Sequence, residues 1–92
     1  MTKPLTFAGE LLELNVCARG FVRVALCNRQ GRPLPGFSLA DCDTIRGDSI
    51  RSVVSWKGAS GLGRYIGKTI RLQFELFDAK LYAFQFAAKH KP

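Results

Sequence analysis

The sequence is poor in the residues that carry most enzymatic chemistry. It has one histidine, His90, in the C-terminal tail, and seven acidic residues among 92. A zinc site or a nucleophile–base pair needs further ligands or a base, and the core region supplies none. Cys17, Cys27 and Cys42 lack any C-x-x-C spacing. We therefore expect three reduced, mostly buried thiols, with a bridge to Cys42 left open.

Long apolar segments are also missing. No hydrophobic run approaches the length of a membrane span, and Met1-Thr-Lys-Pro opens no signal-peptide core. We expect a soluble chain with no membrane partner, and reduced cysteines fit the cytoplasm without fixing a compartment. The length indicates a single domain over residues 1–92, in which residues 87–92 form a basic tail that frays.

Positive charge is what the sequence has in excess. Fourteen Lys and Arg against seven Asp and Glu give a net charge of +7. The basic residues are scattered along the chain, and no two are adjacent. This spacing favours solvated strand faces over a dedicated phosphate-binding patch. We expect no specific nucleic-acid binding and only salt-labile association with anionic polymers.

Apolar and polar residues alternate in several short segments, as in half-buried β-strands. The alternation is clearest in residues 69–77, followed by a turn at 78–80 and a last strand over 81–86. Residues 12–17 and 21–26 alternate on either side of a turn at 18–20 and predict a hairpin. No segment has the period of an amphipathic helix. The sequence therefore predicts an all-β fold, a single antiparallel β-sandwich of about seven to eight short strands.

A polar arch over residues 38–48 precedes a further predicted strand and carries three carboxylates, Asp41, Asp43 and Asp48. They could pin the arch by accepting backbone hydrogen bonds, bind calcium, or include an acid/base pair. We favour the structural role. The spacing differs from an EF-hand, Arg46 stands among the carboxylates as a competing cation, and a small sandwich offers little room for a sugar-binding cleft.

Two aromatic residues are candidates for carbohydrate binding, because flat rings stack on the C–H faces of sugars. Trp56 is one, although its parity with Ile50 and Val54 favours a place in the core. Tyr65 lies in a predicted loop and is the more exposed candidate. Tyr82 falls on the common apolar face of the last strand, so we expect it in the core with its hydroxyl at the margin.

One long motif resembles a known family. Residues 36–58 read G-F-S-L-A-D-C-D-x-I-x-G-D-S-I-x-x-V-V-x-W-K-G, and P-L-T-F at 4–7, L-E-L-N at 12–15 and D-A-K-L-Y-A-F-Q-F at 78–86 extend the match. Together they resemble the C-terminal β-sandwich of levanase- or invertase-like (family 32) glycoside hydrolases. The matching positions carry over only as fold-defining residues: Gly36, Phe37, Asp41, Gly47, Asp48, Trp56, Gly58, Asp78, Leu81, Tyr82 and Phe86.

In that family the catalytic carboxylates lie in a separate propeller, so no catalytic residue carries over to this chain. The resemblance implies a non-catalytic accessory domain without a cofactor or metal. Its expected partner is a catalytic domain of the same or another protein, or a second copy, with weak carbohydrate contact. The alternative is a free-standing, small basic protein that binds an anionic polymer or a protein partner.

Overall fold

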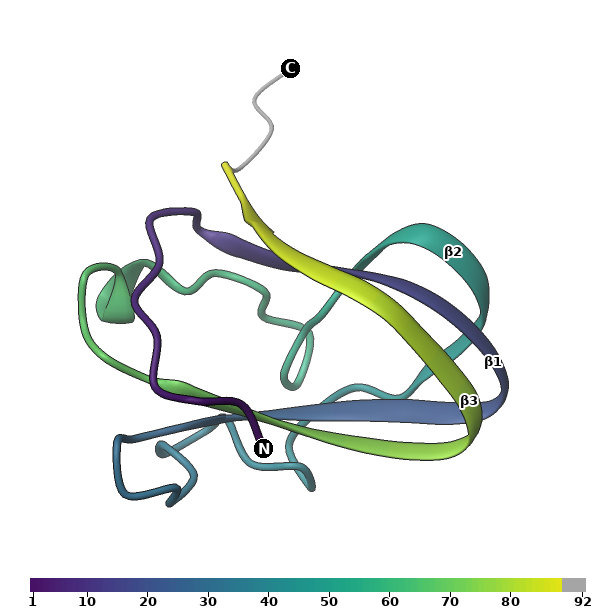
Figure 1. The fold of residues 1–92 in the computed structure, drawn as a ribbon, viewed down its shortest axis with the longest axis horizontal. Coiled ribbons are helices and arrows are strands. Elements are labelled where there is room, and N and C mark those ends of the chain that lie inside the picture. Colours follow the sequence, from purple (N-terminus) through teal and green to yellow (C-terminus); the bar gives the residue numbers. More distant parts are fainter. Residues whose placement is uncertain (89–92) are drawn as a thin grey trace.

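A computed structural model describes residues 1–88 of the chain. These residues form three strands, β1 (Leu11–Cys27), β2 (Ile45–Val53) and β3 (Arg71–Ala87), and one short 3-10 helix, η1 (Gly63–Tyr65). The strands make an antiparallel sheet in the order β2-β1-β3 (Figure 1). The all-β prediction is confirmed, whereas a sandwich of seven to eight strands is not shown.

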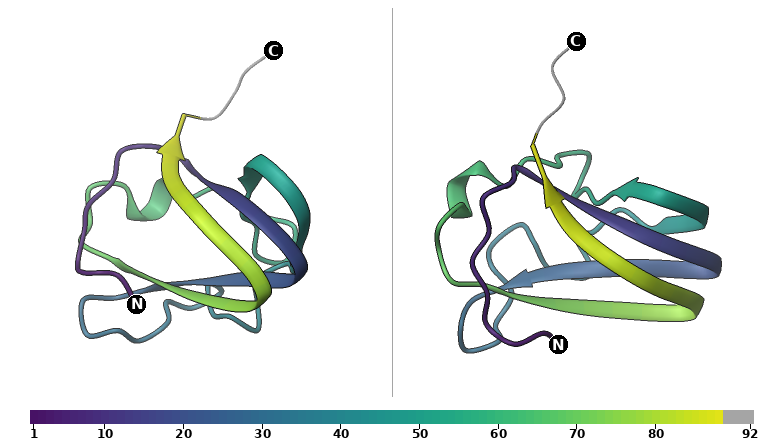
Figure 2. Two further views of the ribbon diagram at one scale, coloured as in Figure 1. Left: turned by 45° about the vertical axis from the view of Figure 1, so that its right-hand side comes forward. Right: turned by 45° about the horizontal axis from the view of Figure 1, so that its top comes forward.

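β1 and β3 are long strands of 17 residues that bend midway. Because they bend at the same place, the sheet folds over into two layers (Figures 1 and 2). The predicted hairpin at 18–20 and the predicted turn at 78–80 are therefore wrong. The segments on either side of each expected turn do not pair with each other; they are two arms of one strand, and both arms of β1 pair with β3.

The bend depends on two residues that also predicted the turns. A Cβ atom on Gly20 would lie 2.0 Å from the carbonyl oxygen of Phe77, so only glycine allows the two strands to approach this closely. Opposite, Asp78 has a φ of 46°, a left-handed conformation that aspartate adopts more readily than most residues. The strands therefore turn a corner without breaking their pairing.

The core lies between the two layers. Alternate side chains of β1 are buried on both sides of the bend, and the loop after β2 adds Val54, Trp56 and Leu62 to the same cluster. The even-numbered residues of β1 face the core on both sides of the bend, so this one strand supplies core side chains to both layers. The buried even-numbered residues of β1 are Leu12, Leu14, Val16, Ala18, Val22, Val24 and Leu26.

The N-terminal segment closes one side of the folded sheet. Leu5 forms an antiparallel bridge with Ile70, and the Thr2 N–H donates to the Leu72 carbonyl at 2.8 Å. Farther along, the Phe7 ring stacks on Phe86 with a centroid separation of 4.4 Å. The segment thus covers the beginning and the end of β3. Of the predicted tail 87–92, Ala87 belongs to β3, and residues 89–92, with His90, lie outside the described residues.

Candidate functional site

Asp41 holds the start of the arch together. Its Oδ2 accepts a hydrogen bond from the Ser38 hydroxyl at 2.8 Å, and the Ser38 Oγ accepts one from the Asp41 N–H. The Lys57 ammonium lies 3.2 Å from Oδ1. The Ser38 hydroxyl and the Lys57 ammonium stabilise the carboxylate and lower the pKa of Asp41. This carboxylate is occupied by the chain itself.

Asp43 ties the arch to the turn at residues 57–58, which directly follows the buried Trp56. Its Oδ2 accepts hydrogen bonds from the Ser55 hydroxyl at 2.6 Å and from the Gly58 N–H at 2.8 Å. The Asp43 N–H donates in return to the Ser55 carbonyl. These donors, the Ser55 hydroxyl first, lower the pKa of Asp43. The arrangement is an Asx-type clamp between segments twelve or more residues apart.

Asp48 lies apart from the other two carboxylates. The arch is shorter than expected, because β2 already begins at Ile45, and Asp48 stands within that strand opposite Cys17. Its carboxylate is the main cause of the raised pKa of the half-buried Cys17 thiol. Within residues 1–88, no group of three His, Cys, Asp or Glu side chains is placed to hold a metal ion.

Trp56 is part of the core and presents no ring face to a ligand. Its side chain is 3% exposed, and Nε1 donates to the Val24 carbonyl at 2.9 Å. The Phe37 ring packs against it edge-on. As a sugar platform Trp56 is therefore ruled out in this structure. The alternation correctly placed Trp56 in the core with Val54. It also assigned Ile50 to that buried face, but Ile50 is 81% exposed.

Tyr65 is less free than a loop position suggested. It ends η1 and is half-buried. Its ring meets Phe37 edge-on with centroids 5.5 Å apart, and the Lys68 ammonium lies over the ring, 5.7 Å from its centroid. Tyr65 thus belongs to the margin of the core, and a ligand would have to displace Lys68 to reach that ring face.

Tyr82 is the more exposed of the two tyrosines, at 61%. Asn15 of β1 pairs with Ala83 of β3, but the next residue, Val16, pairs with Leu81. Tyr82 is therefore the extra residue of a β-bulge. A bulge changes the direction of a side chain, and this one turns Tyr82 away from the apolar face that the alternation assigned to it.

A second bulge lies on the other side of Asn15. Leu14 pairs with Ser52 of β2 and Val16 pairs with Ser49, so two residues, Ile50 and Arg51, oppose Asn15 alone. This irregularity accounts for the exposure of Ile50, which an unbroken strand would not place there. Asn15 is thus flanked by bulges in both neighbouring strands, and the sheet surface is hollowed around it.

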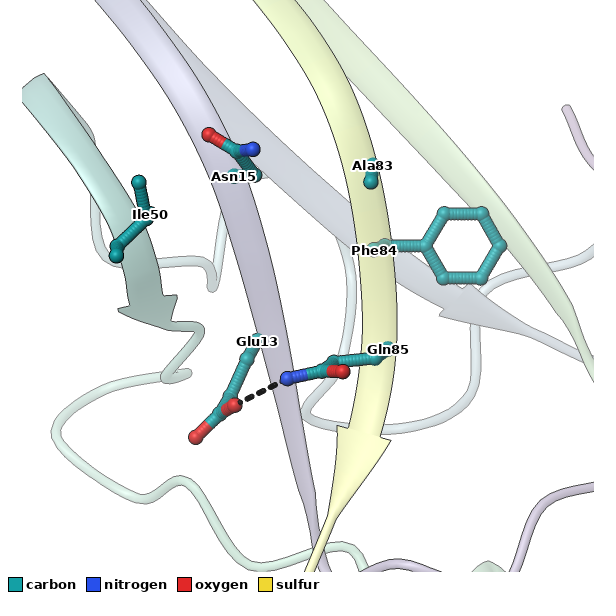
Figure 3. Close-up of a pocket in the computed structure, with 6 residues that line it drawn as sticks. All are labelled: Glu13, Asn15, Ile50, Ala83, Phe84 and Gln85. Atoms are coloured by element: carbon teal, nitrogen blue, oxygen red, sulfur yellow. Dashed lines mark hydrogen bonds between the residues drawn. The ribbon is translucent and has the colours of Figure 1, made fainter.

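We call this surface the sheet-face groove: two adjoining hollows on the outer side of the sheet. The first, of about 190 Å³, surrounds Asn15. Figure 3 shows Glu13 and Gln85 pointing toward each other at its lower end, joined by a hydrogen bond of 2.9 Å. Its lining residues are Glu13, Asn15, Ile50, Ala83, Phe84 and Gln85.

The second hollow continues the groove toward the bend. It has a volume of about 480 Å³ and carries charges of both signs. The Tyr82 ring belongs to this hollow, while its neighbour Ala83 lines the first, so Tyr82 stands between the two. The lining residues are Cys17, Arg19, Asp78, Ala79, Lys80 and Tyr82.

The groove offers binding groups without an acid/base pair. Glu13 is the only acidic residue among the described residues that line the first hollow, and Asp78 is the only one in the second. Glu13 also lies 3.7 Å from the Arg51 guanidinium. Glycoside hydrolysis uses two carboxyl groups across one bond. Amide, carboxylate and hydroxyl groups around an exposed ring are instead suited to holding a polyhydroxylated ligand.

Sequence reasoning missed this groove for a definite reason. A bulge adds one residue to one strand, so it is detected only when the pairing with the neighbouring strand is known. The alternation in residues 81–86 is regular enough to place Tyr82 beside Phe84 and Phe86. The one available signal was Ile50, an apolar residue between polar neighbours in a strand with weak alternation.

In comparisons with known proteins, no protein-family model, no curated protein and no solved structure matches the chain. Residues 1–88 also contain no helix that is long and apolar enough to span a bilayer.

Proposed function

We propose that this chain is a non-catalytic accessory β-domain of a glycoside-hydrolase-like protein, which supports a catalytic domain and contacts carbohydrate weakly through the sheet-face groove. The resemblance of residues 36–58 to a family 32 C-terminal sandwich gives the proposal its direction. The observation that carries it is Tyr82, an aromatic ring directed to solvent by a bulge and set between two hollows lined with polar groups.

The chemistry of the groove fits neutral sugars. A pyranose or furanose ring can lie against Tyr82 through its C–H groups, while its hydroxyls reach Asn15 and Gln85, whose amides both donate and accept. The groove is shallow and exposed, so little of the ligand surface would be buried. Such contacts correspond to dissociation constants on the order of 1 mM.

The acidic residues support a non-catalytic role. Asp41 and Asp43 are occupied by hydrogen bonds within the arch, and Glu13 is bound to Gln85 and paired with Arg51. None is a carboxyl group set opposite a second one across a groove. Under this proposal the purified chain hydrolyses neither fructosyl nor other glycosidic substrates, and measured turnover that Glu13→Gln abolishes would contradict it.

The test of carbohydrate contact is a nuclear magnetic resonance titration with fructosyl and other neutral oligosaccharides at up to tens of millimolar. We expect amide shifts at Asn15, Ala83 and Gln85, and their loss in Tyr82→Ala. Tyr65→Ala is the matched control, because it removes the other tyrosine and leaves the groove intact. The proposal fails if no saccharide shifts the groove, or if Tyr65→Ala alone abolishes the shifts.

The alternative, a free-standing basic protein that binds anionic polymers, rests on the net charge of +7. Several of the basic residues are already partnered, including Arg23, 3.6 Å from Glu75, and Arg51, 3.7 Å from Glu13. A labelled-oligonucleotide titration separates the two functions. The accessory domain should show only binding that disappears at physiological salt. Submicromolar affinity that survives there and is lost in Arg51→Ala would favour the basic binding protein.

A further inference from the structure

The strand β3 has a free outer edge. It is the last strand in the order β2-β1-β3. Its start is covered by Thr2, whose N–H bonds the Leu72 carbonyl, and near its end Phe7 stacks on Phe86. From Gln73 to Ala87, no described residue makes a backbone hydrogen bond to the side of β3 that faces away from β1. A long unpaired edge is a template for a further strand, and proteins usually shorten, charge or cover it.

This edge is apolar as well as unpaired. Leu76 is 46% exposed, Phe77 63% and Phe84 37%, beside the exposed Tyr82. Phe74 and Phe84 come from opposite arms of the bent strand, and their rings lie 5.6 Å apart. The hydrophobic interior between the two layers therefore reaches solvent along β3. Apolar surface gathered in this way marks an interaction site.

The edge is electrically neutral in a strongly basic chain. Arg71 and Lys80 balance Glu75 and Asp78 within β3, so the whole net charge of +7 lies outside this strand. Two copies of the chain would repel each other through most of their surfaces. That repulsion is weakest where the two β3 edges meet.

The bend restricts which strand can pair with this edge. A straight strand can follow only one arm, whereas β1 follows both because it bends opposite Asp78, between Ala18 and Phe21. A second β3 also has a bend at its middle. A two-fold axis normal to the sheet near the bend, the local symmetry of any antiparallel pair, brings the two bends close together, so that each arm of one strand runs beside the opposite arm of the other.

We propose that the chain forms a symmetric dimer in which two β3 edges pair antiparallel about Ala79, giving one continuous sheet in the order β2-β1-β3-β3-β1-β2. In this register Asp78 lies opposite Lys80 of the second copy, and the reverse contact follows by symmetry. Phe74 lies opposite Phe84 of the second copy, on the inner side of the sheet. The pairing satisfies the free edge and covers part of the exposed Phe84 ring on the inner side of the sheet.

This interface shares Asp78, Ala79 and Lys80 with the second hollow of the sheet-face groove. The dimer is argued from the free edge and its charges alone, so it does not rest on carbohydrate contact. A bent strand from another protein could in principle occupy the same edge. The charge pattern favours the second copy, because only self-pairing about Ala79 places the opposite charges of Asp78 and Lys80 across from each other twice.

Sedimentation of the full chain from 1 µM to 500 µM tests the dimer. We expect a monomer–dimer equilibrium for the parent. Lys80→Asp should weaken it about tenfold, since it creates two like-charge pairs across the axis. Adding Asp78→Asn removes that repulsion and should recover most of the affinity, and asparagine tolerates the left-handed φ at this position. Melting curves of each variant separate loss of dimer from loss of folding.

Cross-linking then tests the register. Ala79→Cys lies on the proposed axis, within disulfide reach of its own symmetry mate, and should form a covalent dimer under mild oxidation. Ala83→Cys is the control: its symmetry mate is about 26 Å away along the strand at 3.3 Å per residue. The parent chain controls for Cys17. A parent that stays monomeric at 500 µM, a dimer unchanged by Lys80→Asp, or cross-linking at Ala83→Cys in place of Ala79→Cys overturns the proposal.

Discussion

The bend in β1 makes a sharp prediction for Gly20→Ala. In the structure a Cβ atom on Gly20 would lie 2.0 Å from the carbonyl oxygen of Phe77, whereas ordinary contact begins near 3.4 Å. The nearest atom belongs to the backbone, so the strands themselves would have to separate by the difference, about 1.4 Å. A ladder hydrogen bond of about 2.9 Å would lengthen to about 4.3 Å and be lost.

The size of the effect follows from these losses. Two broken ladder bonds cost about 1 kcal/mol each, and residual overpacking adds about 1–3 kcal/mol. We therefore expect Gly20→Ala to lower the free energy of unfolding by about 3–5 kcal/mol. For a domain of this length each kcal/mol corresponds to roughly 4–8 °C in Tm, so the melting temperature should fall by at least about 12 °C.

Thermal unfolding followed by circular dichroism measures the change. Gly61→Ala is the matched control, because no atom lies within 4 Å of its added Cβ and its φ is not left-handed; its Tm should stay close to that of the parent. A hairpin turn at this position would cost only about 1–2 kcal/mol on the same substitution. A fall of a few degrees or less in Gly20→Ala would therefore refute the continuous bent strand.

Three further substitutions test the core, the arch and the thiols. Trp56→Phe should lower the free energy of unfolding by about 2–4 kcal/mol in chemical denaturation, because it leaves the buried Val24 carbonyl unpaired and a cavity beside it; an unchanged midpoint would remove the indole from the core. Asp43→Ala should lower Tm more than Asp48→Ala. The lowered pKa of Asp43 means that its contribution is present above the unfolded-state value near pH 4 and lost as pH falls through the folded value, so the two variants should converge in acid; equal Tm values at pH 7 would contradict the clamp. Asp48→Ala should lower the raised pKa of Cys17 and speed its reaction with a disulfide reagent at pH 8, and an unchanged rate would separate the two groups.

Much of the strand content could be predicted from the sequence. The alternation in residues 12–17, 21–26 and 69–77 marks real strand segments, because successive side chains in a strand point alternately to opposite faces of the sheet. The parity of Trp56 with Val54 correctly indicated the core. These features are local: they depend on the spacing of apolar residues and not on which strand lies next to which.

A hairpin turn and a bend within one continuous strand produce the same local sequence pattern. Gly20 and Asp78 are typical of turns, and the apolar parity of β1 is unbroken across the bend, as it would be in many hairpins. Only the pairing decides between them, and it shows each arm of β1 against β3. Whether a strand reverses or turns a corner depends on contacts between residues far apart in the sequence.

The candidate site shows the same division. The sequence alone determined that the fold is all-β and that residues of the types used in catalysis are few. It also placed Asp41 and Asp43 where a loop needs hydrogen-bond acceptors. The exposure of Tyr82, the hollow around Asn15 and the free edge of β3 were decided by the tertiary structure. Each arises from the register between strands, and register is set by the fit of whole strands against one another, which no short stretch of sequence contains.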